Sequence, residues 1–245
     1  MELTGQVAIV TGAGQGIGES VTELLSSRGA SVVIVDRAKT NADRVVNSIL
    51  SKGGKACAIN VDLGKVESIP AIFDFCEQQY GKPDIFVSNA GAGIPPKPLE
   101  EITEEDYEIT FNTNAKANLF ILKEAKTRMN EGGRIVLVSS SSVVNPVPGI
   151  DIYIASKAAI MAMAQSTVTE FASRGITINT VLPGLTETPM VHDHSKDFLA
   201  AQAAMNPFGR LGNPIDVAEA IAFFCEKRSQ WLTGQYVVAA GGSTT

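Results

Sequence analysis

Long apolar runs, clustered charge and paired cysteines are all missing from this chain of 245 residues. No apolar run approaches the ~18 residues that a membrane helix requires. The first residues also lack the basic segment and the apolar stretch of a secretory signal. We therefore expect a cytoplasmic protein that has no membrane partner.

Charge of one sign does not dominate any part of the chain. The 20 lysines and arginines and the 26 acidic residues give a formal net charge of −6, and both kinds are dispersed along the sequence. A nucleic-acid partner is therefore not expected. Hydrophobic residues make up 44% of the chain and charged residues 19%, so enough apolar surface is present to build a substantial core.

Potential metal ligands are few. The three cysteines, Cys57, Cys76 and Cys225, are odd in number, far apart and without zinc-ligand spacing. We expect them to be core thiols in a reducing compartment. His192 and His194 alternate, which is compatible with a metal site, but no third ligand is evident and exposed polar residues are the favoured interpretation. We predict no metal.

Short β-branched runs alternate with longer helical patterns along most of the sequence. Strands are expected at residues 7–11, 32–35, 85–88, 135–138, 176–181 and 236–238, with a further one ahead of Asn60. Helices are expected at residues 17–28, 42–52, 68–80, 104–129, 153–174 and 214–226. Nearly continuous apolar strands are typical of a parallel sheet covered on both faces. The alternation predicts one doubly wound α/β domain of about seven strands, flanked by helices on both faces.

A second domain is not indicated, because no flexible linker or internal repeat divides residues 1–245. One segment, residues 184–210, interrupts the alternation where a strand should pass directly into a helix. Connections of this length are often functional, and we expect a lid over a substrate.

The first strand runs into a glycine-rich loop, Thr11-Gly12-Ala13-Gly14-Gln15-Gly16-Ile17-Gly18. Glycines permit a tight turn and a close backbone approach, and the helix that follows directs free N–H groups at an anion. Its Gly-x-x-x-Gly-x-Gly spacing departs from the commoner G-x-G-x-x-G pattern. Because the loop lies between a strand and a helix, we predict that it binds the pyrophosphate of a dinucleotide.

Asp36 ends the second strand, 18 residues beyond Gly18, where dinucleotide folds place a carboxylate on the adenosine ribose. A carboxylate there repels the 2′-phosphate of NADP, so NAD is predicted and NADP is the poorer fit. Arg37 is the competing feature, because its guanidinium could reach a phosphate. Asp62 and Leu63 are expected to meet the adenine edge, although a helix-capping role for Asp62 is nearly as well supported.

Tyr153 and Lys157 are four residues apart at the start of a helical pattern, so they share one face. A cation close to a phenol favours the phenolate and brings the tyrosine into range for acid–base chemistry. Ser139 and Ser140 follow the strand at residues 135–138, at the edge where parallel sheets bind ligands. A hydroxyl there could bind a carbonyl or alcohol oxygen beside Tyr153.

Together these residues resemble the short-chain dehydrogenase/reductase family, classical subtype. The resemblance rests on the segment from Thr11 to Gly18, Asp62, Ser88-Asn89-Ala90-Gly91, Asn114, Ser140, Tyr153 with Lys157, Pro183-Gly184, and the closing Leu232-Thr233-Gly234-Gln235 and Gly241-Gly242. It covers essentially the whole chain. The family implies a Rossmann-like fold, a bound NAD(H) or NADP(H), and hydride transfer between nicotinamide and a carbinol or carbonyl carbon.

The resemblance also implies a role for each matched residue. Tyr153 becomes the general acid/base, Lys157 lowers the pKa of Tyr153 and holds the nicotinamide ribose, and Ser140 orients the substrate oxygen. Asn114 holds a water that links Lys157 to a proton relay. The implied cofactor contacts are Gly12, Gln15, Gly16, Ile17, Gly18, Asp36, Asp62, Leu63, Asn89, Ala90, Gly91, Tyr153, Lys157, Pro183, Gly184 and Thr188. Ser88 departs from the asparagine that the family often has there.

We therefore predict an NAD-dependent oxidoreductase for a small-to-medium secondary alcohol or the matching ketone. Substrate contacts are expected from residues 93–98, 142–152 and 184–210, which include Ser142 and Leu185. Ser140 and Tyr153 are also expected to contact the substrate. One alternative is a 3-oxoacyl-carrier-protein reductase, and another is a dinucleotide-binding scaffold protein without turnover. The family also implies a homotetramer built from the helices at residues 104–129 and 153–174 and the last strand.

Overall fold

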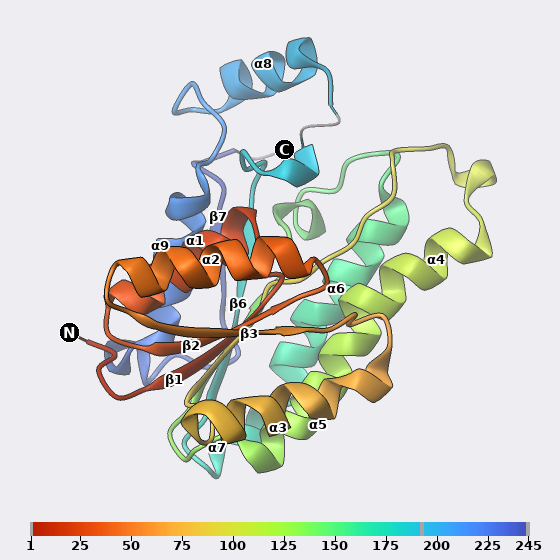
Figure 1. Ribbon diagram of the computed structural model, residues 1–245. Helices are drawn as coiled ribbons and strands as arrows, with labels where there is room; N and C mark the ends of the chain where they lie inside the picture. The colour runs from red at the N-terminus through yellow and green to blue at the C-terminus, as the bar shows by residue number, and fades with distance from the viewer. Residues whose placement is uncertain (1, 192–193, 244–245) are drawn as a thin grey trace.

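Seven parallel strands form the centre of the computed structural model, which describes residues 2–191 and 194–243 (Figure 1). They are β1 (Val7–Thr11), β2 (Ser31–Asp36), β3 (Lys55–Asn60), β4 (Ile85–Ser88), β5 (Arg134–Val138), β6 (Thr177–Pro183) and β7 (Tyr236–Ala239). Their order is β3-β2-β1-β4-β5-β6-β7. From β1 the sheet continues through β2 and β3 on one side, and from β4 it continues through β5, β6 and β7 on the other. The strand order therefore reverses between β1 and β4, and a crevice opens at the carboxyl ends of those two strands.

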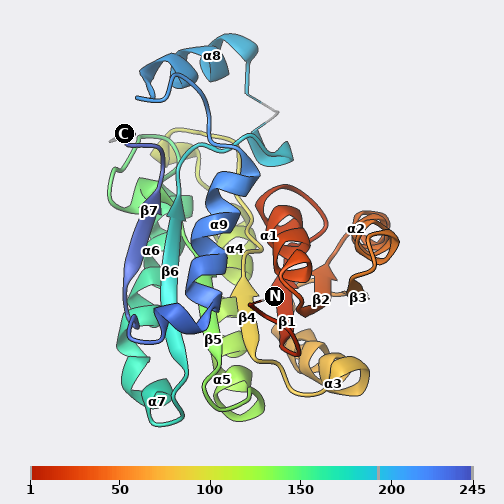
Figure 2. The same cartoon turned by 90° about the vertical axis from the view of Figure 1, so that its left-hand side faces the viewer.

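The helices form a layer on each face of the sheet, except for α8 (Lys196–Met205), which lies beyond the carboxyl ends of the strands (Figures 1 and 2). They are α1 (Gly16–Ser27), α2 (Lys39–Ser51), α3 (Ile69–Tyr80), α4 (Glu104–Phe111), α5 (Ala117–Arg128), α6 (Asp151–Ser166), α7 (Val168–Ala172), α8 (Lys196–Met205) and α9 (Pro214–Cys225). Short 3₁₀ turns are η1 (Val66–Ser68), η2 (Leu99–Glu101), η4 (Ser141–Val143), η5 (Pro189–Val191) and η6 (Lys227–Ser229), and a π-helical turn, η3, spans Asn112–Lys116.

An apolar core lies on each face of the sheet, between the strands and the helices that cover them. Alternate strand residues such as Val10 and Ile34 pack against α1, α2 and α9. Their neighbours Ile9 and Val33 point to the other face and pack with residues of α3, α5 and α6. Every residue of β1, β4 and β5 is buried. The predicted doubly wound fold, with helices on both faces of the sheet, is therefore confirmed, while the edge strands β3 and β7 keep accessible side chains.

Several elements differ from their predicted bounds. The helix expected at residues 104–129 contains the π-helical turn η3, so that α4 and α5 are joined through it. The helix expected at residues 153–174 begins earlier, at Asp151, and is interrupted at Thr167. A helix that the sequence did not predict, α8, lies within residues 184–210, beyond the carboxyl ends of the strands (Figure 2). Its sequence contributes no buried side chain to the core, which is why its apolar periodicity is weak.

The cysteines and the hydropathy of the helices can be compared with the sequence expectations. Cys57, Cys76 and Cys225 are free, and the last two are buried. Through the part of the chain that the structure describes, no helix is both long and apolar enough to cross a membrane.

Candidate active site

The glycine-rich loop joins β1 to α1 and leaves no room for a side chain at Gly12 or Gly18. Gly12 has a φ of +62°, and a Cβ there would lie 2.8 Å from the Ala90 Cα. A Cβ on Gly18 would lie 2.1 Å from the Gly12 main-chain oxygen. Gly16, Ile17 and Gly18 open α1, and the first N–H groups of a helix have no partner within it. The loop therefore fits a pyrophosphate held by backbone N–H groups and the helix dipole.

Asn89 connects this loop to the end of β4. Its side-chain amide donates to the Thr11 and Gly12 main-chain oxygens at 3.0 and 3.1 Å. The Thr11 hydroxyl in turn accepts from the N–H groups of Asn89 and Ala90 at 3.0 and 3.1 Å. These four bonds hold the carboxyl ends of β1 and β4 together at the point where the strand order reverses. Ala90 and Gly91 consequently pass beside the glycine-rich loop.

Asp36 ends β2 and is buried beside the same loop. One carboxylate oxygen accepts from the Gly14 N–H at 2.8 Å, and the other accepts from the Ala38 N–H at 2.8 Å. A Cβ on Gly14 would approach that first oxygen to 2.8 Å, so the glycine is what lets the carboxylate fit. Arg37 is exposed. The carboxylate is thus fixed beside the glycine-rich loop, and its contact with an adenosine ribose stays a prediction.

Asp62 and Leu63 lie just beyond the end of β3. The Asp62 side chain is exposed, and its Oδ1 accepts from the Gly64 N–H at 3.0 Å. Leu63 is buried in the apolar core beneath α3. Asp62 therefore closes a local turn, while the Val61 N–H bonds to the Asp36 main-chain oxygen and holds the turn beside β2.

Tyr153 and Lys157 face the sheet from the first two turns of α6. The Lys157 Nζ lies 5.7 Å from the centre of the Tyr153 ring. Burial raises the pKa of the Tyr153 phenol, and a hydrogen bond with Ser140 opposes this rise. The Ser140 hydroxyl also lies 2.8 Å from that of Ser142. The structure thus brings Ser140, Ser142 and Tyr153 together, and their contact with a substrate stays a prediction.

Lys157 is buried, and its Nζ donates to the Val138 main-chain oxygen at 3.0 Å. Burial lowers the pKa of Lys157 to about 8. A Cβ on Gly91 would lie 3.1 Å from this Nζ, so the missing side chain at residue 91 is what makes room for the ammonium. Ser139, which the sequence left as an alternative to Ser140, instead donates to the Lys157 main-chain oxygen at 2.8 Å.

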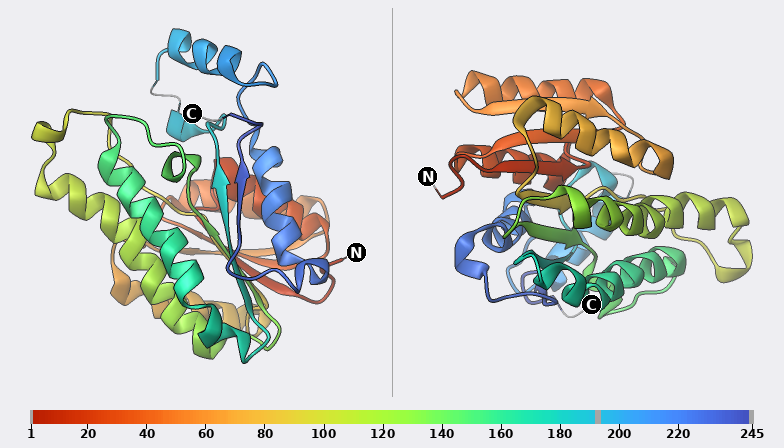
Figure 3. Two further views of the ribbon diagram at one scale, coloured as in Figure 1. Left: turned by 180° about the vertical axis from the view of Figure 1, so that it is seen from behind. Right: turned by 90° about the horizontal axis from the view of Figure 1, so that it is seen from below.

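Asn114 is completely buried in the π-helical turn between α4 and α5. Its Oδ1 accepts from the Ala92 N–H, and its Nδ2 donates to the Ala92 main-chain oxygen, both at 2.8 Å. The same Nδ2 donates to the Ser156 hydroxyl at 2.9 Å. The Asn114 side chain thus joins the segment after Gly91 to the helix that carries Tyr153, and α4 packs beside α6 (Figure 3). A pairing through Ser156 was not predicted, although its position directly before Lys157 is the signal that would have shown it.

Pro183 is the last residue of β6, and Gly184 follows it. The Gly184 N–H bonds to the Ala239 main-chain oxygen at 3.0 Å. Thr188 follows near the start of α1, since a Cβ on Gly16 would lie 3.0 Å from its Cγ2. Leu185 is half-buried, and its main-chain oxygen accepts from the Gly212 N–H at 3.0 Å. Residues 183–188 therefore border the space between the glycine-rich loop and α6.

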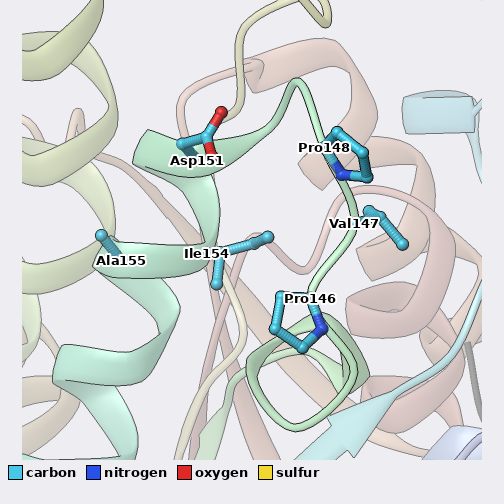
Figure 4. Close-up of a pocket in the computed structure, with 6 residues that line it drawn as sticks. All are labelled: Pro146, Val147, Pro148, Asp151, Ile154 and Ala155. Carbon is cyan, nitrogen blue, oxygen red and sulfur yellow. The ribbon is translucent and has the colours of Figure 1, made fainter. Parts of the chain in front are cut away.

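A shallow pocket of about 320 Å³ lies beside this site (Figure 4). It is lined by Pro146, Val147, Pro148, Asp151, Ile154 and Ala155. The lining comes from residues 146–148 and the first turns of α6, part of the predicted substrate region. Tyr153 does not line it, so the pocket adjoins the tyrosine without containing it.

His194 stacks on Phe198, with ring centres 4.8 Å apart. His192 lies outside the described residues. Within residues 2–191 and 194–243, no three histidine, cysteine, aspartate or glutamate side chains are grouped to hold a metal ion.

The structure thus brings the glycine-rich loop, Asp36, Ser140, Tyr153 and Lys157 to the carboxyl ends of the strands, where open parallel sheets bind their ligands. Comparison with known proteins identifies the family. Residues 12–244 match the family described as enoyl-(acyl carrier protein) reductase. A hydroxynaphthalene reductase-like protein of Metarhizium majus is 37% identical over 99% of this chain and 96% of its own length.

Solved structures agree as well. The promiscuous reductase LugOII, which catalyses keto-reduction at C1 in lugdunomycin biosynthesis, superposes with a TM-score of 0.94 at 30% identity, covering 100% of both chains. The angucycline C-6 ketoreductase LanV, solved with bound NADP, has a TM-score of 0.92 at 31% identity, covering 99% of this chain and 97% of its own. The chain belongs to the short-chain dehydrogenase/reductase family of nicotinamide-dependent oxidoreductases.

Proposed function

We propose that this protein transfers a hydride between a nicotinamide cofactor and a small-to-medium secondary alcohol or the matching ketone. The observation that carries the proposal is the placement of Ser140, Tyr153 and Lys157 at one edge of the sheet. Relatives whose names describe keto-reduction support the same class of substrate. When bound, nicotinamide would accept the hydride from an alcohol or donate it to a ketone, and the chain would correspondingly take up or supply the proton.

Each of the three residues has a distinct part in that proton transfer. Ser140 donates a hydrogen bond to the substrate oxygen and orients it toward Tyr153. Because burial raises the pKa of Tyr153, the phenol is protonated at neutral pH and is ready to protonate a carbonyl oxygen. Lys157 holds its Nζ 5.7 Å from the centre of the Tyr153 ring, and in this proposal its positive charge stabilises the phenolate that forms. Asn114 keeps the helix of Tyr153 in register with residues 91–92.

The preferred cofactor in this proposal is NAD(H). The support for this choice is the Asp36 carboxylate, which is held by the Gly14 and Ala38 N–H groups and would repel a 2′-phosphate bound beside it. Opposing this preference, LanV was solved with NADP, and Arg37 is exposed beside Asp36. A phosphate held by Arg37 is therefore the alternative that the cofactor experiment has to separate.

Substrate is expected to bind under residues 184–210. In the described part of this segment, α8 has no buried residue, and Phe198 and Met205 are 42% and 64% exposed. The helix lies beyond the carboxyl ends of the strands (Figure 2). Apolar side chains on a helix of this placement suit a cover over a hydrophobic substrate, and we propose that the whole chain otherwise forms one catalytic domain.

A reductase that accepts substrates on a carrier protein would need exposed basic residues for docking. Lys126, Arg128 and Arg174 are the candidates, and each already pairs with an acidic side chain. Lys126 pairs with Glu170, Arg128 pairs with Asp74 at 2.6 Å, and Arg174 pairs with Glu131 at 2.7 Å. These pairs favour a free small molecule over a carrier-bound acyl group.

The homotetramer implied by the family also belongs to this proposal. All four residues of β7 have accessible side chains, with Tyr236, Val237 and Val238 at 45%, 42% and 40%, and the neighbouring Trp231 is 95% exposed. Tyr107 and Leu119 on α4 and α5 are also exposed. Apolar surface on an open sheet edge is what a second copy of the chain would cover.

The test is turnover of a panel of secondary alcohols and ketones with both cofactors, followed at the nicotinamide absorbance. We expect wild-type activity with free ketones and a loss of about 10³-fold in kcat for Tyr153→Phe, with cofactor binding retained. Activity on acyl groups only when they are carried by an acyl-carrier protein would support the carrier reductase. A chain that binds NAD(H) without turning over any substrate would be a scaffold, and the proposal would then be wrong.

A further inference from the structure

Asn118 is a buried amide in a part of α5 that otherwise contributes apolar side chains. It is 2% exposed, while Ala117, Ile121 and Leu122 around it belong to the apolar core. Its Nδ2 donates to the Asn114 main-chain oxygen at 2.6 Å. Its Oδ1 is buried and has no hydrogen-bond partner among the described residues. Burying an amide that satisfies only one of its two ends is costly, so this residue is not explained by packing.

The acceptor of this bond lies in the π-helical turn Asn112–Lys116. In that turn the Ala117 N–H bonds to the Asn112 main-chain oxygen, five residues back, so the usual four-residue ladder is interrupted. Main-chain oxygens within such a turn can accept an additional donor. The Asn118 amide supplies one to Asn114 and so holds the widened turn in this form.

Holding the turn also holds the Asn114 side chain. That side chain makes three hydrogen bonds, two to Ala92 and one to the Ser156 hydroxyl. The Ser156 hydroxyl donates in turn to the Tyr153 main-chain oxygen at 2.8 Å. A continuous series of hydrogen bonds therefore runs from Asn118 to the residue that carries the phenol.

The same series reaches Lys157 from the other side. Ala92 follows Gly91, where a Cβ would lie 3.1 Å from the Lys157 Nζ and 3.4 Å from the Asn114 Oδ1. A shift of Asn114 would therefore displace the main chain at Gly91 and Ala92, which lies next to the Lys157 ammonium. Both partners of the proton transfer depend on where Asn114 sits.

We propose that Asn118 is a positioning residue: its amide holds the π-helical turn so that Asn114 joins Ala92 to Ser156 and fixes Lys157 relative to Tyr153. The kinetic part of this inference rests on the proposed function. The structural part does not, because it concerns hydrogen bonds that are present whether or not the enzyme turns over.

The kinetic test compares Asn118→Leu, which removes the donor at similar volume, with Asn118→Gln, which keeps an amide. We expect kcat to fall about tenfold or more in the leucine variant, with KM changed by less than about twofold and the pH midpoint of kcat displaced. The glutamine variant should recover most of kcat. Thr110→Val is the matched control, since Thr110 is equally buried on the same helical stretch and its Oγ1 makes no hydrogen bond among the described residues.

A second measurement does not need turnover. The Ala92 N–H donates to Asn114 Oδ1, so its hydrogen exchange reports whether Asn114 is held. We expect exchange at Ala92 to quicken about tenfold in Asn118→Leu and to be unchanged in Thr110→Val, with Val136 in β5 as the internal reference for overall stability.

The outcomes separate the two proposals. Unchanged exchange at Ala92 together with an unchanged pH midpoint in Asn118→Leu would overturn the positioning role. Equal quickening at Ala92 and Val136 would also overturn it, because Asn118 would then act only through overall stability. A wild-type protein without turnover would count against the proposed function alone, and the exchange at Ala92 would still decide the role of Asn118.

Discussion

The Lys157 Nζ lies 5.7 Å from the centre of the Tyr153 ring. Hydrogen bonds with other residues hold the two groups at this separation. The Nζ is tied to the Val138 main-chain oxygen, and the Tyr153 main-chain oxygen is tied to Ser156. The Lys157 Nζ is thus anchored to β5, whereas the Tyr153 main chain is anchored within α6. Their relative position depends on how α6 packs against β5.

The burial of Lys157 predicts a pH-dependent stability. Because the folded-state pKa of about 8 lies below the ordinary value of 10.5, the unfolded chain binds this proton more tightly. Protonation therefore disfavours the folded state below the folded pKa, and this penalty decreases as the pH rises from about 8 toward 10.5. Between about pH 7.5 and about pH 9.5, the free energy of unfolding of the wild type should rise by about 2 kcal/mol relative to Lys157→Met. Denaturant unfolding of both proteins at the two pH values measures it, and parallel pH dependences would contradict the pKa shift.

Gly91 predicts an effect on rate without a comparable effect on stability. In Gly91→Ala the new Cβ would come close to the Lys157 Nζ, the flexible end of a side chain that can move away. The free energy of unfolding should therefore change by less than about 1 kcal/mol. Displacing the ammonium should nevertheless lower kcat about tenfold or more. Steady-state kinetics and thermal unfolding of the same preparation separate the two effects. A kcat within twofold of wild type would show that the position of Lys157 is not critical.

Asp36 predicts the cofactor preference. Wild type should bind NAD(H) at least about tenfold more tightly than NADP(H), because the fixed carboxylate repels a 2′-phosphate. Asp36→Asn should remove most of this difference, whereas Asp43→Asn, an exposed carboxylate on α2, should leave it unchanged. Fluorescence titration with both cofactors measures the ratio. Tighter binding of NADP(H) that is lost in Arg37→Ala would reverse the assignment.

The exposed β7 edge predicts the assembly. Val237→Lys should convert a tetramer into smaller species, because it places a charge on the apolar strand that a second copy would cover. Leu50→Lys is the matched control, since Leu50 is similarly exposed at 50% but lies on α2, at the other end of the sheet. Sedimentation velocity at micromolar concentration decides, and a monomeric wild type would rule this interface out.

Much of the fold was predictable because its signals are local. The apolar runs at β1 and β5, the glycines between β1 and α1, and the spacing of Tyr153 and Lys157 each report a backbone period or a tight turn within a few residues. Helix bounds were accurate to a few residues wherever an amphipathic pattern ended at a glycine or proline. The candidate site residues could be placed at one sheet edge for the same reason, since parallel strands bring their carboxyl ends together.

Other features depend on segments that are distant in the sequence and meet only on folding. The π-helical turn around Asn114 has no sequence pattern of its own. The Asn114 side chain forms its hydrogen bonds with Ala92 and Ser156 only when α4, β4 and α6 pack together. The carboxylate of Asp36 meets Gly14 across 22 residues for the same reason. Local periodicity could therefore assign the elements and the chemistry of this chain. The separations between its reacting groups come from the packing of whole layers, because each group is positioned by contacts that no short stretch of sequence contains.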